Sequence, residues 1–168
     1  GIRADAMGLV KTIQTLTFLL SLKEEKKEVS TIIISPSSLV FNWKAEVQKF
    51  TPKLSAQTVV GTAKEREKII KDHSKYDILI TSYDLLKRDI ALYEDVKFNN
   101  EIIDEAQFIK NHNTSQAKAV RAINSVHRFA LTGTPIENRL SELWSIFDYL
   151  MPGFLFNQES FRRLISNP

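Results

Sequence analysis

Two adjacent carboxylates, Asp104 and Glu105, follow the short, mainly apolar segment Glu101-Ile102-Ile103. A strand ending on two acids delivers them to the carboxyl edge of a sheet, where one can hold a hydrated metal ion and the next can orient a water molecule. A solvated turn after a strand would also explain the dipeptide on its own. Lys11 and Thr12 favour the chemical interpretation, because a lysine followed by a threonine is the other half of a nucleoside-triphosphate site.

The segments between these motifs alternate between strands and helices. Apolar runs typical of strands occur at 31–34, 77–81, 101–103 and 128–132, with a weaker one at 57–60. Helical spacing of apolar residues predicts helices from Lys11 onward, after Pro36-Ser37-Ser38 and over 140–150. A polar helix is expected over about 63–71, and further helices after Ser82 and after Thr114 or Ser115. Gly1 to Ala4 is interpreted as the end of a strand and Asp5 to Val10 as a loop. The pattern predicts an α/β domain, a mostly parallel sheet with helices on both faces.

The candidate motifs all follow predicted strands. Because the carboxyl ends of parallel strands meet at one edge of a sheet, we expect these motifs to lie together there. They are Lys11-Thr12, Pro36-Ser37-Ser38, Thr81-Ser82-Tyr83, Asp104-Glu105 and Thr132-Gly133-Thr134.

Composition sets the limits of the function. With 168 residues, 43% of them hydrophobic, the chain suits one soluble domain with a core. It has no cysteine, which excludes disulfides and thiolate metal sites, and its three histidines have no metal-ligand spacing. No apolar run has the roughly 20 residues that cross a membrane, and no signal-peptide pattern is present. The net charge of +3 permits a polyanionic partner. We expect a location in the cytoplasm or nucleoid of a bacterium, or in the nucleus of a eukaryote.

The ordered motifs carry a family resemblance. They resemble the helicase motifs of Swi/Snf-related ATPases, in helicase superfamily two, in order and spacing and over essentially the whole chain. The resemblance implies a RecA-like P-loop domain, the first lobe of an ATP-driven motor on double-stranded DNA. We expect residues 1–168 to form one such lobe, truncated at both ends and without the second lobe. The segments are 5–12, 34–39, Asn42-Trp43, 80–83, Asp104-Glu105-Ala106-Gln107, and 131–136 with Asn138.

The resemblance implies ATP and Mg²⁺ as cofactors. Backbone N–H groups of a loop entering a helix cradle phosphates, a lysine reaches the terminal phosphates and a hydroxyl ligates magnesium. Lys11 and Thr12 fit the last two roles, Asp104 would hold magnesium through its hydration shell, and Glu105 would orient or activate the attacking water. The implied ATP-binding set is Asp5, Met7, Gly8, Leu9, Val10, Lys11 and Thr12, and the implied coupling set is Gln107, Thr132, Gly133 and Thr134. Structural alternatives remain for Lys11 as a helix-start lysine, Thr134 as a cap and Pro135 as a first-turn residue.

The chain departs from the family pattern at four positions. The family has an apolar residue in place of Arg3, an acidic residue in place of Ala6 and glycine in place of Val10, and Glu101 stands where its strand is usually apolar. Glycine is used where backbone approaches a phosphate closely, and a β-branched valine brings bulk and stiffness there. We therefore predict weakened or abolished nucleotide affinity relative to a glycine version. The alternative is that the loop shifts and tolerates valine.

Contact with DNA is expected through hydroxyls, backbone N–H groups and a few lysines that follow the phosphate backbone, so binding should be salt-sensitive, independent of base sequence and weak for a lone lobe. The candidates are Ser37, Ser38, Thr81 and Ser82, then Lys87 and Arg88. Ser37 and Ser82 could equally be helix caps. In the family a second lobe supplies an arginine finger worth about 10³ to 10⁵ in rate, so this lobe alone should turn over ATP very slowly at best.

Three functions stay open at this point. The first is an ATPase motor lobe, and the second is a nucleotide-independent DNA-binding or scaffold module derived from one. The third, a small P-loop kinase or GTPase, explains Lys11, Thr12 and Asp104 but leaves the motifs at 36–38 and 132–135 unexplained.

Overall fold

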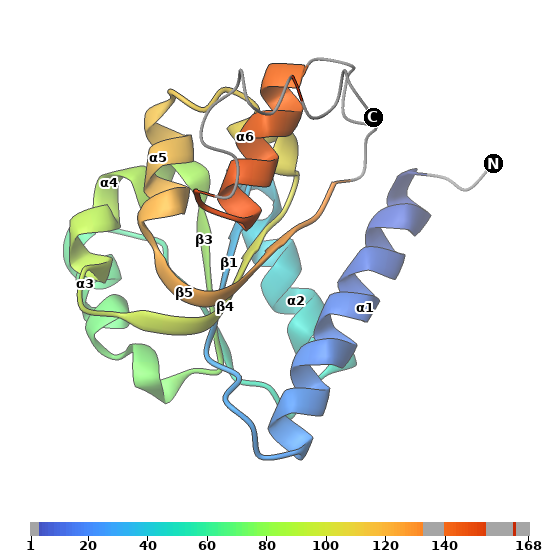
Figure 1. Ribbon diagram of the computed structural model, residues 1–168. Helices are drawn as coiled ribbons and strands as arrows, with labels where there is room; N and C mark the ends of the chain where they lie inside the picture. The colour runs from blue at the N-terminus through green and yellow to red at the C-terminus, as the bar shows by residue number, and fades with distance from the viewer. Residues whose placement is uncertain (1–3, 133–139, 154–162, 164–168) are drawn as a thin grey trace.

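The computed structural model describes residues 4–132, 140–153 and 163 (Figure 1). In the described residues a five-stranded sheet lies at the centre, in the strand order β2-β3-β1-β4-β5. All neighbouring strands are parallel, which confirms the predicted α/β class. The strands are β1 Thr31–Ser35, β2 Ala56–Thr58, β3 Ile78–Ser82, β4 Lys97–Ile103 and β5 Asn124–Ala130.

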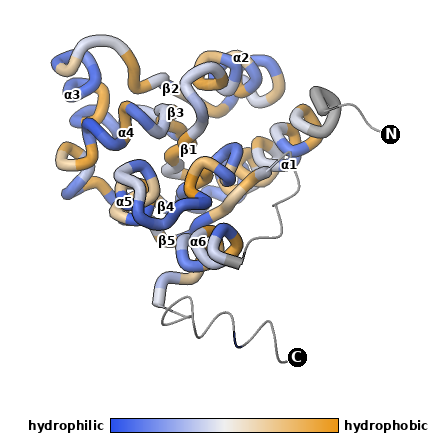
Figure 2. The backbone as a smooth tube through the Cα atoms, turned by 90° about the horizontal axis from the view of Figure 1, so that it is seen from above, coloured by the Kyte–Doolittle hydropathy of each residue, from blue (hydrophilic) through white to orange (hydrophobic). Residues whose placement is uncertain are grey.

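Helices cover both faces of the sheet, as Figure 2 shows from above. One face is covered by α1 Ala4–Glu24 and α2 Val40–Phe50, whose residues Leu16, Leu19 and Val47 share a core with Ile33 and Ile80 of the sheet. The opposite face carries the other four helices in a second core. They are α3 Ala63–Lys71, α4 Tyr83–Asp89, α5 Ser115–Ala122 and α6 Leu140–Leu150. Central strands read as continuous apolar runs because both faces are buried.

The first helix begins earlier than the sequence predicted. We expected Ala4 to end a strand and Asp5 to Val10 to form a loop, but α1 runs without a break from Ala4 to Glu24. The stretch contains one glycine, Gly8, among alanine, methionine and leucine, which are strong helix formers. With Val10 in place of a second glycine, little opposes extension of the helix backward from Lys11.

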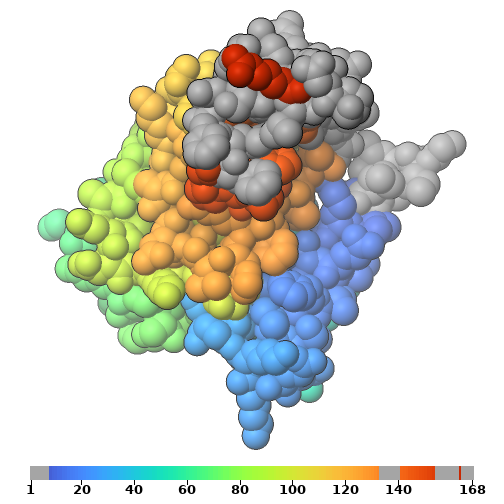
Figure 3. Space-filling model, viewed as in Figure 1, coloured from blue at the N-terminus to red at the C-terminus, as the bar shows by residue number. Residues whose placement is uncertain are grey.

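The last strand is displaced toward the amino end. The prediction placed it at 128–132, whereas β5 spans Asn124–Ala130 and pairs in register with β4 from Lys97 onward. The polar residues at its start gave no strand signal, because they lie in an edge strand whose first residues are largely exposed. Backbone pairing with β4 therefore sets the strand start. Figure 3 shows α1, in blue, against the orange residues of this region, where Phe18 and Phe129 contact at 5.6 Å between ring centroids.

Two helix starts confirm the predicted caps, and one does not. The Ser82 hydroxyl accepts a hydrogen bond from Leu85 N–H at the start of α4, and the Thr114 hydroxyl does the same for Ala117 N–H at α5. The cap alternative for Ser37 is wrong, because no side chain caps the short 3-10 helix Ser37–Leu39 or the α2 that follows.

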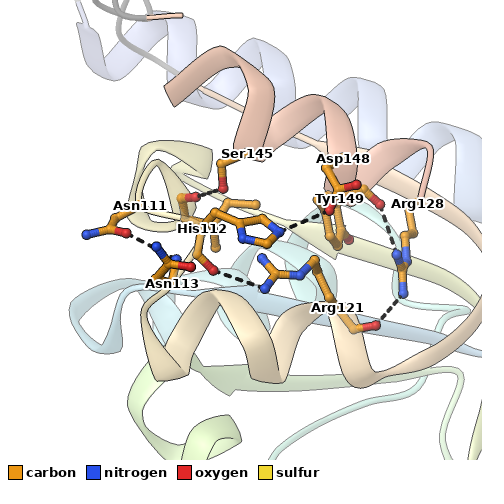
Figure 4. Close-up of polar contacts among 9 residues, drawn as sticks. Asn111, His112, Asn113, Arg121, Arg128, Ser145, Asp148 and Tyr149 are labelled. Carbon is orange, nitrogen blue, oxygen red and sulfur yellow. Dashed lines mark hydrogen bonds and ion pairs between the residues drawn. The ribbon is translucent and has the colours of Figure 1, made fainter. Parts of the chain in front are cut away.

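A polar network docks α6 onto the rest of the domain (Figure 4). His112 contacts Asp148 of α6 at 3.2 Å, and Arg121 donates to the His112 carbonyl at 3.0 Å. Arg128 of β5 donates to the carbonyl of Tyr149 at 2.9 Å and stacks over its ring. The segment that follows Glu105 is thereby tied to α6. Within the described residues no helix is both long and apolar enough to span a membrane.

Candidate nucleotide site

A cleft of about 520 Å³ opens at the carboxyl edge of the sheet. It brings together the two halves of the predicted site, which are more than 90 residues apart in the sequence. Residues from α1, from α2 and from the ends of β4 and β5 line it: Gly8, Leu9, Lys11, Thr12, Leu39, Asn42, Trp43, Glu46, Asp104, Glu105 and Leu131. A hollow of similar size, about 580 Å³, lies elsewhere, at Val29, Tyr76 and Phe98 near the amino ends of the strands, and none of the predicted site residues borders it.

Asp104 is held from three sides at the end of β4. Trp43 Nε1 donates to its Oδ2 at 2.9 Å, and the backbone N–H of Glu105 donates to its Oδ1 at 2.9 Å. The Tyr83 hydroxyl donates to the Asp104 carbonyl at 2.6 Å, which fixes the backbone as well. Burial raises the pKa of the Asp104 carboxyl above its ordinary value, and the Trp43 hydrogen bond and the Lys11 charge lower that pKa without cancelling the rise.

Glu105 is joined to the predicted coupling residues. Gln107 Nε2 donates to Glu105 Oε2 at 2.6 Å, and the Thr132 hydroxyl donates to Gln107 Oε1 at 3.4 Å. Glu105 also has a left-handed backbone, with φ 53° and ψ 59°, which is uncommon outside glycine. Such conformations persist only where the surrounding structure imposes them and concentrate at functional sites. The hydrogen bonds from Thr132 to Gln107 and from Gln107 to Glu105 therefore connect the second acid to Thr132, just after β5.

Lys11 and Thr12 lie on α1 in the same cleft, as predicted from the sequence. Lys11 is half-buried, and its positive charge is close enough to lower the pKa of Asp104. Thr12 is buried, and its hydroxyl donates to the carbonyl of Gly8 at 3.0 Å, one helical turn earlier. In this conformation the hydroxyl proton is bound within the helix, while the oxygen keeps its acceptor lone pairs.

The segment before Lys11 does not form a phosphate cradle in this structure. Val10, Lys11 and Thr12 lie beyond the first turn of α1, where each backbone N–H bonds to a carbonyl four residues earlier. The Val10 side chain is 49% exposed and does not line the cleft. A Cβ added at Gly8 would meet no atom within 4 Å, so glycine is not required there for space. The valine is accommodated by a helix and not by a distorted loop.

The residues at the acidic side of the cleft fit a magnesium–triphosphate group. Mg²⁺ is commonly held by one or two carboxylates together with water and substrate phosphates, so Asp104 is a sufficient protein donor. The described residues contain no cluster of three or more His, Asp or Glu, as an all-protein site would need. The backbone directly before Lys11 does not fit the phosphates as it stands, because the N–H groups of Gly8, Leu9 and Val10 lie beyond the first turn and are engaged within the helix.

The predicted DNA residues divide into two kinds. Ser37 and Ser38 are exposed just after β1, at the carboxyl edge. Thr81 is fully buried with an unpartnered hydroxyl, and Ser82 is 2% exposed and caps α4. Lys87 and Arg88, in the last turn of α4, are exposed as well. The structure therefore presents the serine pair after β1 and these two basic residues at the surface, and buries Thr81 and Ser82. Gly133 and Thr134 lie outside the described residues.

Sequence reasoning missed two residues of the site. The motif segments contained Trp43 and Tyr83 but assigned neither a role in the site; both are buried, and both donate to Asp104. A buried indole or phenol usually needs a hydrogen-bond partner, and this was the available signal. The sequence could not identify the partner, because the contacts depend on how α2 and α4 meet the end of β4.

Comparison with known proteins decides the family. The profile of the SNF2-related domain matches residues 1–168, which is the whole chain. The chain belongs to the SNF2-related family. The assignment confirms the resemblance drawn from the motifs and leaves the P-loop kinase or GTPase alternative without support.

Several SNF2-related proteins are similar over nearly all of this chain. An uncharacterized ATP-dependent helicase of Mycoplasma genitalium is 45% identical over 162 residues, covering 96% of this chain and 16% of that protein. The TATA-binding protein-associated factor mot1 of Schizosaccharomyces pombe is 38% identical, covering all of this chain and 9% of that protein. The chain therefore spans only a small part of the length of these relatives.

A solved structure shows the same fold. The Sulfolobus solfataricus SWI2/SNF2 ATPase core in complex with double-stranded DNA matches with a TM-score of 0.82 and 40% identity, covering 93% of this chain and 32% of that chain. The ATPase core domain from the same organism matches with a TM-score of 0.75 and 36% identity, covering 96% of this chain and 34% of that chain. The sheet and helices described above are thus a RecA-like lobe of the SNF2-related type.

Proposed function

We propose that this chain is the N-terminal ATP-binding lobe of a DNA-dependent ATPase that couples ATP hydrolysis to movement along double-stranded DNA. The observation that carries the proposal is the convergence of Lys11, Asp104 and Glu105 in one cleft, with Gln107 bridging Glu105 to Thr132. The helicase names of several relatives and the DNA-bound structural neighbour support it.

Lys11, Thr12, Asp104 and Glu105 each have a role in this proposal. Bound magnesium would neutralise the phosphate charge that develops during hydrolysis. Asp104 would hold that ion, Lys11 would bind the terminal phosphates, and Glu105 would orient the attacking water. Thr12 would be a magnesium ligand through the lone pairs of its hydroxyl oxygen, which donation to the Gly8 carbonyl leaves available.

The affinity for nucleotide should be low. A phosphate cradle needs free backbone N–H groups directly before Lys11, and the helical conformation of α1 engages those of Gly8, Leu9 and Val10. Forming the cradle would require the first turns of α1 to unwind, and Val10, a β-branched residue, makes the glycine-like torsions of a phosphate loop costly. Part of the binding free energy would therefore be consumed in unwinding the helix.

Turnover and DNA contact depend on more than this lobe in the proposal. A second RecA-like lobe would supply the arginine finger, without which hydrolysis is slower by about 10³ to 10⁵. Ser37 and Ser38 are the hydroxyls placed to meet the phosphate backbone of DNA, since both are exposed and neither makes a side-chain hydrogen bond as a cap.

The test is calorimetric titration of the chain with magnesium–ATP beside the Val10→Gly variant. We expect the glycine variant to bind at least about 10-fold more tightly, a difference of about 1.4 kcal/mol. Lys11→Ala in the Val10→Gly background is expected to remove the magnesium-dependent binding. Equal affinities of the wild type and Val10→Gly would show that valine does not weaken the site. Binding that survives Lys11→Ala would overturn the role of the cleft.

A second candidate function is a nucleotide-independent DNA-binding or scaffold module descended from such a lobe. It is favoured by the same observation, a helix in place of the phosphate loop. It predicts no nucleotide binding by the wild type or by Val10→Gly, together with DNA binding that is indifferent to ATP. The titration above separates the two candidates.

A further inference from the structure

The Asp104 carboxylate is aimed by a donor from a different element. Asp104 follows β4, whereas Trp43 lies on α2, the helix after β1, and β1 and β4 are neighbours in the sheet. The indole N–H crosses from α2 to Asp104 Oδ2 at 2.9 Å, and Trp43 is only 3% exposed. The ring itself lies in the core between α2 and the sheet and also lines the cleft.

The two hydrogen bonds fix the carboxylate without occupying it. Each oxygen accepts one N–H, Oδ2 from Trp43 and Oδ1 from the Glu105 backbone. A carboxylate has about four acceptor sites, so each oxygen retains capacity for a metal ion or its water. The torsion that rotates a carboxylate is otherwise broad, and two donors on its two oxygens restrict it. Both donors are neutral, so they orient the acid without adding a competing positive charge.

We propose that Trp43 is a positioning residue for the metal carboxylate, acting through Asp104 to set the affinity of this lobe for a divalent cation. The proposal rests on the proposed function for its context, since it takes Asp104 to be the metal ligand. Neighbours that orient metal ligands are worth about 10-fold to 100-fold in metal affinity. An apolar ring of similar size would fill the core equally well, so the indole N–H has a purpose that packing alone does not explain.

The test measures binding of Mn²⁺, an oxygen-seeking substitute for Mg²⁺, to the chain without nucleotide, by water-proton relaxation. Trp43→Phe keeps an aromatic ring and removes the N–H, and we expect it to weaken Mn²⁺ binding at least about 10-fold. Asp104→Asn is expected to remove the same binding.

Val47→Ala is the matched control for a purely structural effect. Val47 lies on α2 one turn after Trp43, is fully buried in the same core and does not line the cleft. Its truncation should lower the thermal unfolding midpoint and leave the Mn²⁺ affinity unchanged. The proposal is overturned if Trp43→Phe leaves Mn²⁺ binding unchanged, if Val47→Ala weakens it equally, or if the wild type shows no Asp104-dependent binding.

The same chain tested with ATP separates this proposal from the proposed function. Asp104-dependent Mn²⁺ binding that Trp43→Phe weakens, in a chain that does not bind ATP, would support the positioning role and count against the ATPase proposal. The opposite result is that the chain binds ATP while Trp43→Phe binds Mn²⁺ as tightly as the wild type. That result would support the ATPase proposal and overturn the positioning role of Trp43.

Discussion

Glu101 is a buried acid in the middle of β4, and its neighbours explain how a strand tolerates it. Its side chain is fully buried, with Oε1 at 3.2 Å from Arg128 Nε and accepting from the Ser125 hydroxyl at 3.0 Å. The other oxygen, Oε2, has no hydrogen-bond partner. The sequence marked Glu101 as a departure from an apolar position, and β5 supplies the arginine and serine that accommodate it.

Burial determines the ionisation of Glu101. It raises the pKa of the carboxyl to about 8, while Arg128 and the hydrogen bonds lower that pKa only partly. In the unfolded chain a glutamate has a pKa of about 4.3. Between these two values the folded state retains a proton that the unfolded state has lost, so stability should fall as pH rises through this window and level off above pH 8.

We predict that the free energy of unfolding decreases from pH 5 to pH 8 with a slope contribution from Glu101 on the order of 1 kcal/mol per pH unit. Glu101→Gln removes the titrating group and should flatten that part of the profile, which urea unfolding at several pH values would measure. Glu25→Gln makes the same chemical change at an exposed position and serves as the control. An unchanged slope in Glu101→Gln would contradict the prediction.

At the scale of elements, α1 presents the largest difference between the sequence pattern and the structure. Motif spacing placed Lys11 at a helix start, whereas the structure places it inside a helix that begins at Ala4. The helix propensity of the residues before Lys11 sets the start of α1 at Ala4, and the spacing of the family motifs carries no information about that start. The sequence prediction and the structure differ most at Gly8. The prediction places Gly8 in a loop, and the structure places it inside α1.

We predict that Gly8→Ala stabilises the chain by about 0.5 to 1 kcal/mol, because alanine is favoured over glycine inside a helix and the added Cβ meets no neighbouring atom. Thermal or urea unfolding would measure this. Gly61→Ala is the contrasting control, since Gly61 has φ +101° and a Cβ there would lie 2.5 Å from Glu65 Oε2, so it should destabilise. Destabilisation by Gly8→Ala would indicate that the segment is a loop in solution.

The sequence predicted the buried elements well and their ends less well. The runs at 31–34 and 77–81 became β1 and β3, because fully buried parallel strands are apolar throughout. The polar start of β5 was missed because pairing with β4, and not side-chain character, extends it. Within the site, the motifs located Lys11 and Asp104, but the donation from Trp43 depends on tertiary packing that no spacing encodes.

At the scale of the whole molecule, the cleft and the exposed serines share the carboxyl edge of the sheet. Asp104 and Glu105 follow β4, and Ser37 and Ser38 follow the adjacent β1. Parallel topology therefore places the proposed nucleotide site beside the proposed DNA contacts. The chain covers 32% of the solved core that is bound to DNA, and under the motor-lobe proposal one lobe would supply only part of the binding surface. DNA binding by this chain should accordingly be weak and dominated by contacts to phosphates.

We predict that the chain binds double-stranded oligonucleotides of unrelated sequence with equal affinity, and that the affinity falls linearly with salt on a log–log plot. Replacing Ser37 and Ser38 together by alanine should weaken binding by about 10-fold at low salt, since each neutral hydrogen bond contributes about 0.5 to 1.5 kcal/mol. Fluorescence anisotropy would measure both effects. Thr81→Ala is the internal control, because Thr81 is fully buried and should affect stability without direct loss of a DNA contact.

If magnesium–ATP alters the affinity of the chain for DNA, the motor-lobe proposal gains support. If DNA binding is indifferent to ATP even in the Val10→Gly variant, the scaffold candidate is the better account, and affinity that depends on base sequence would contradict both.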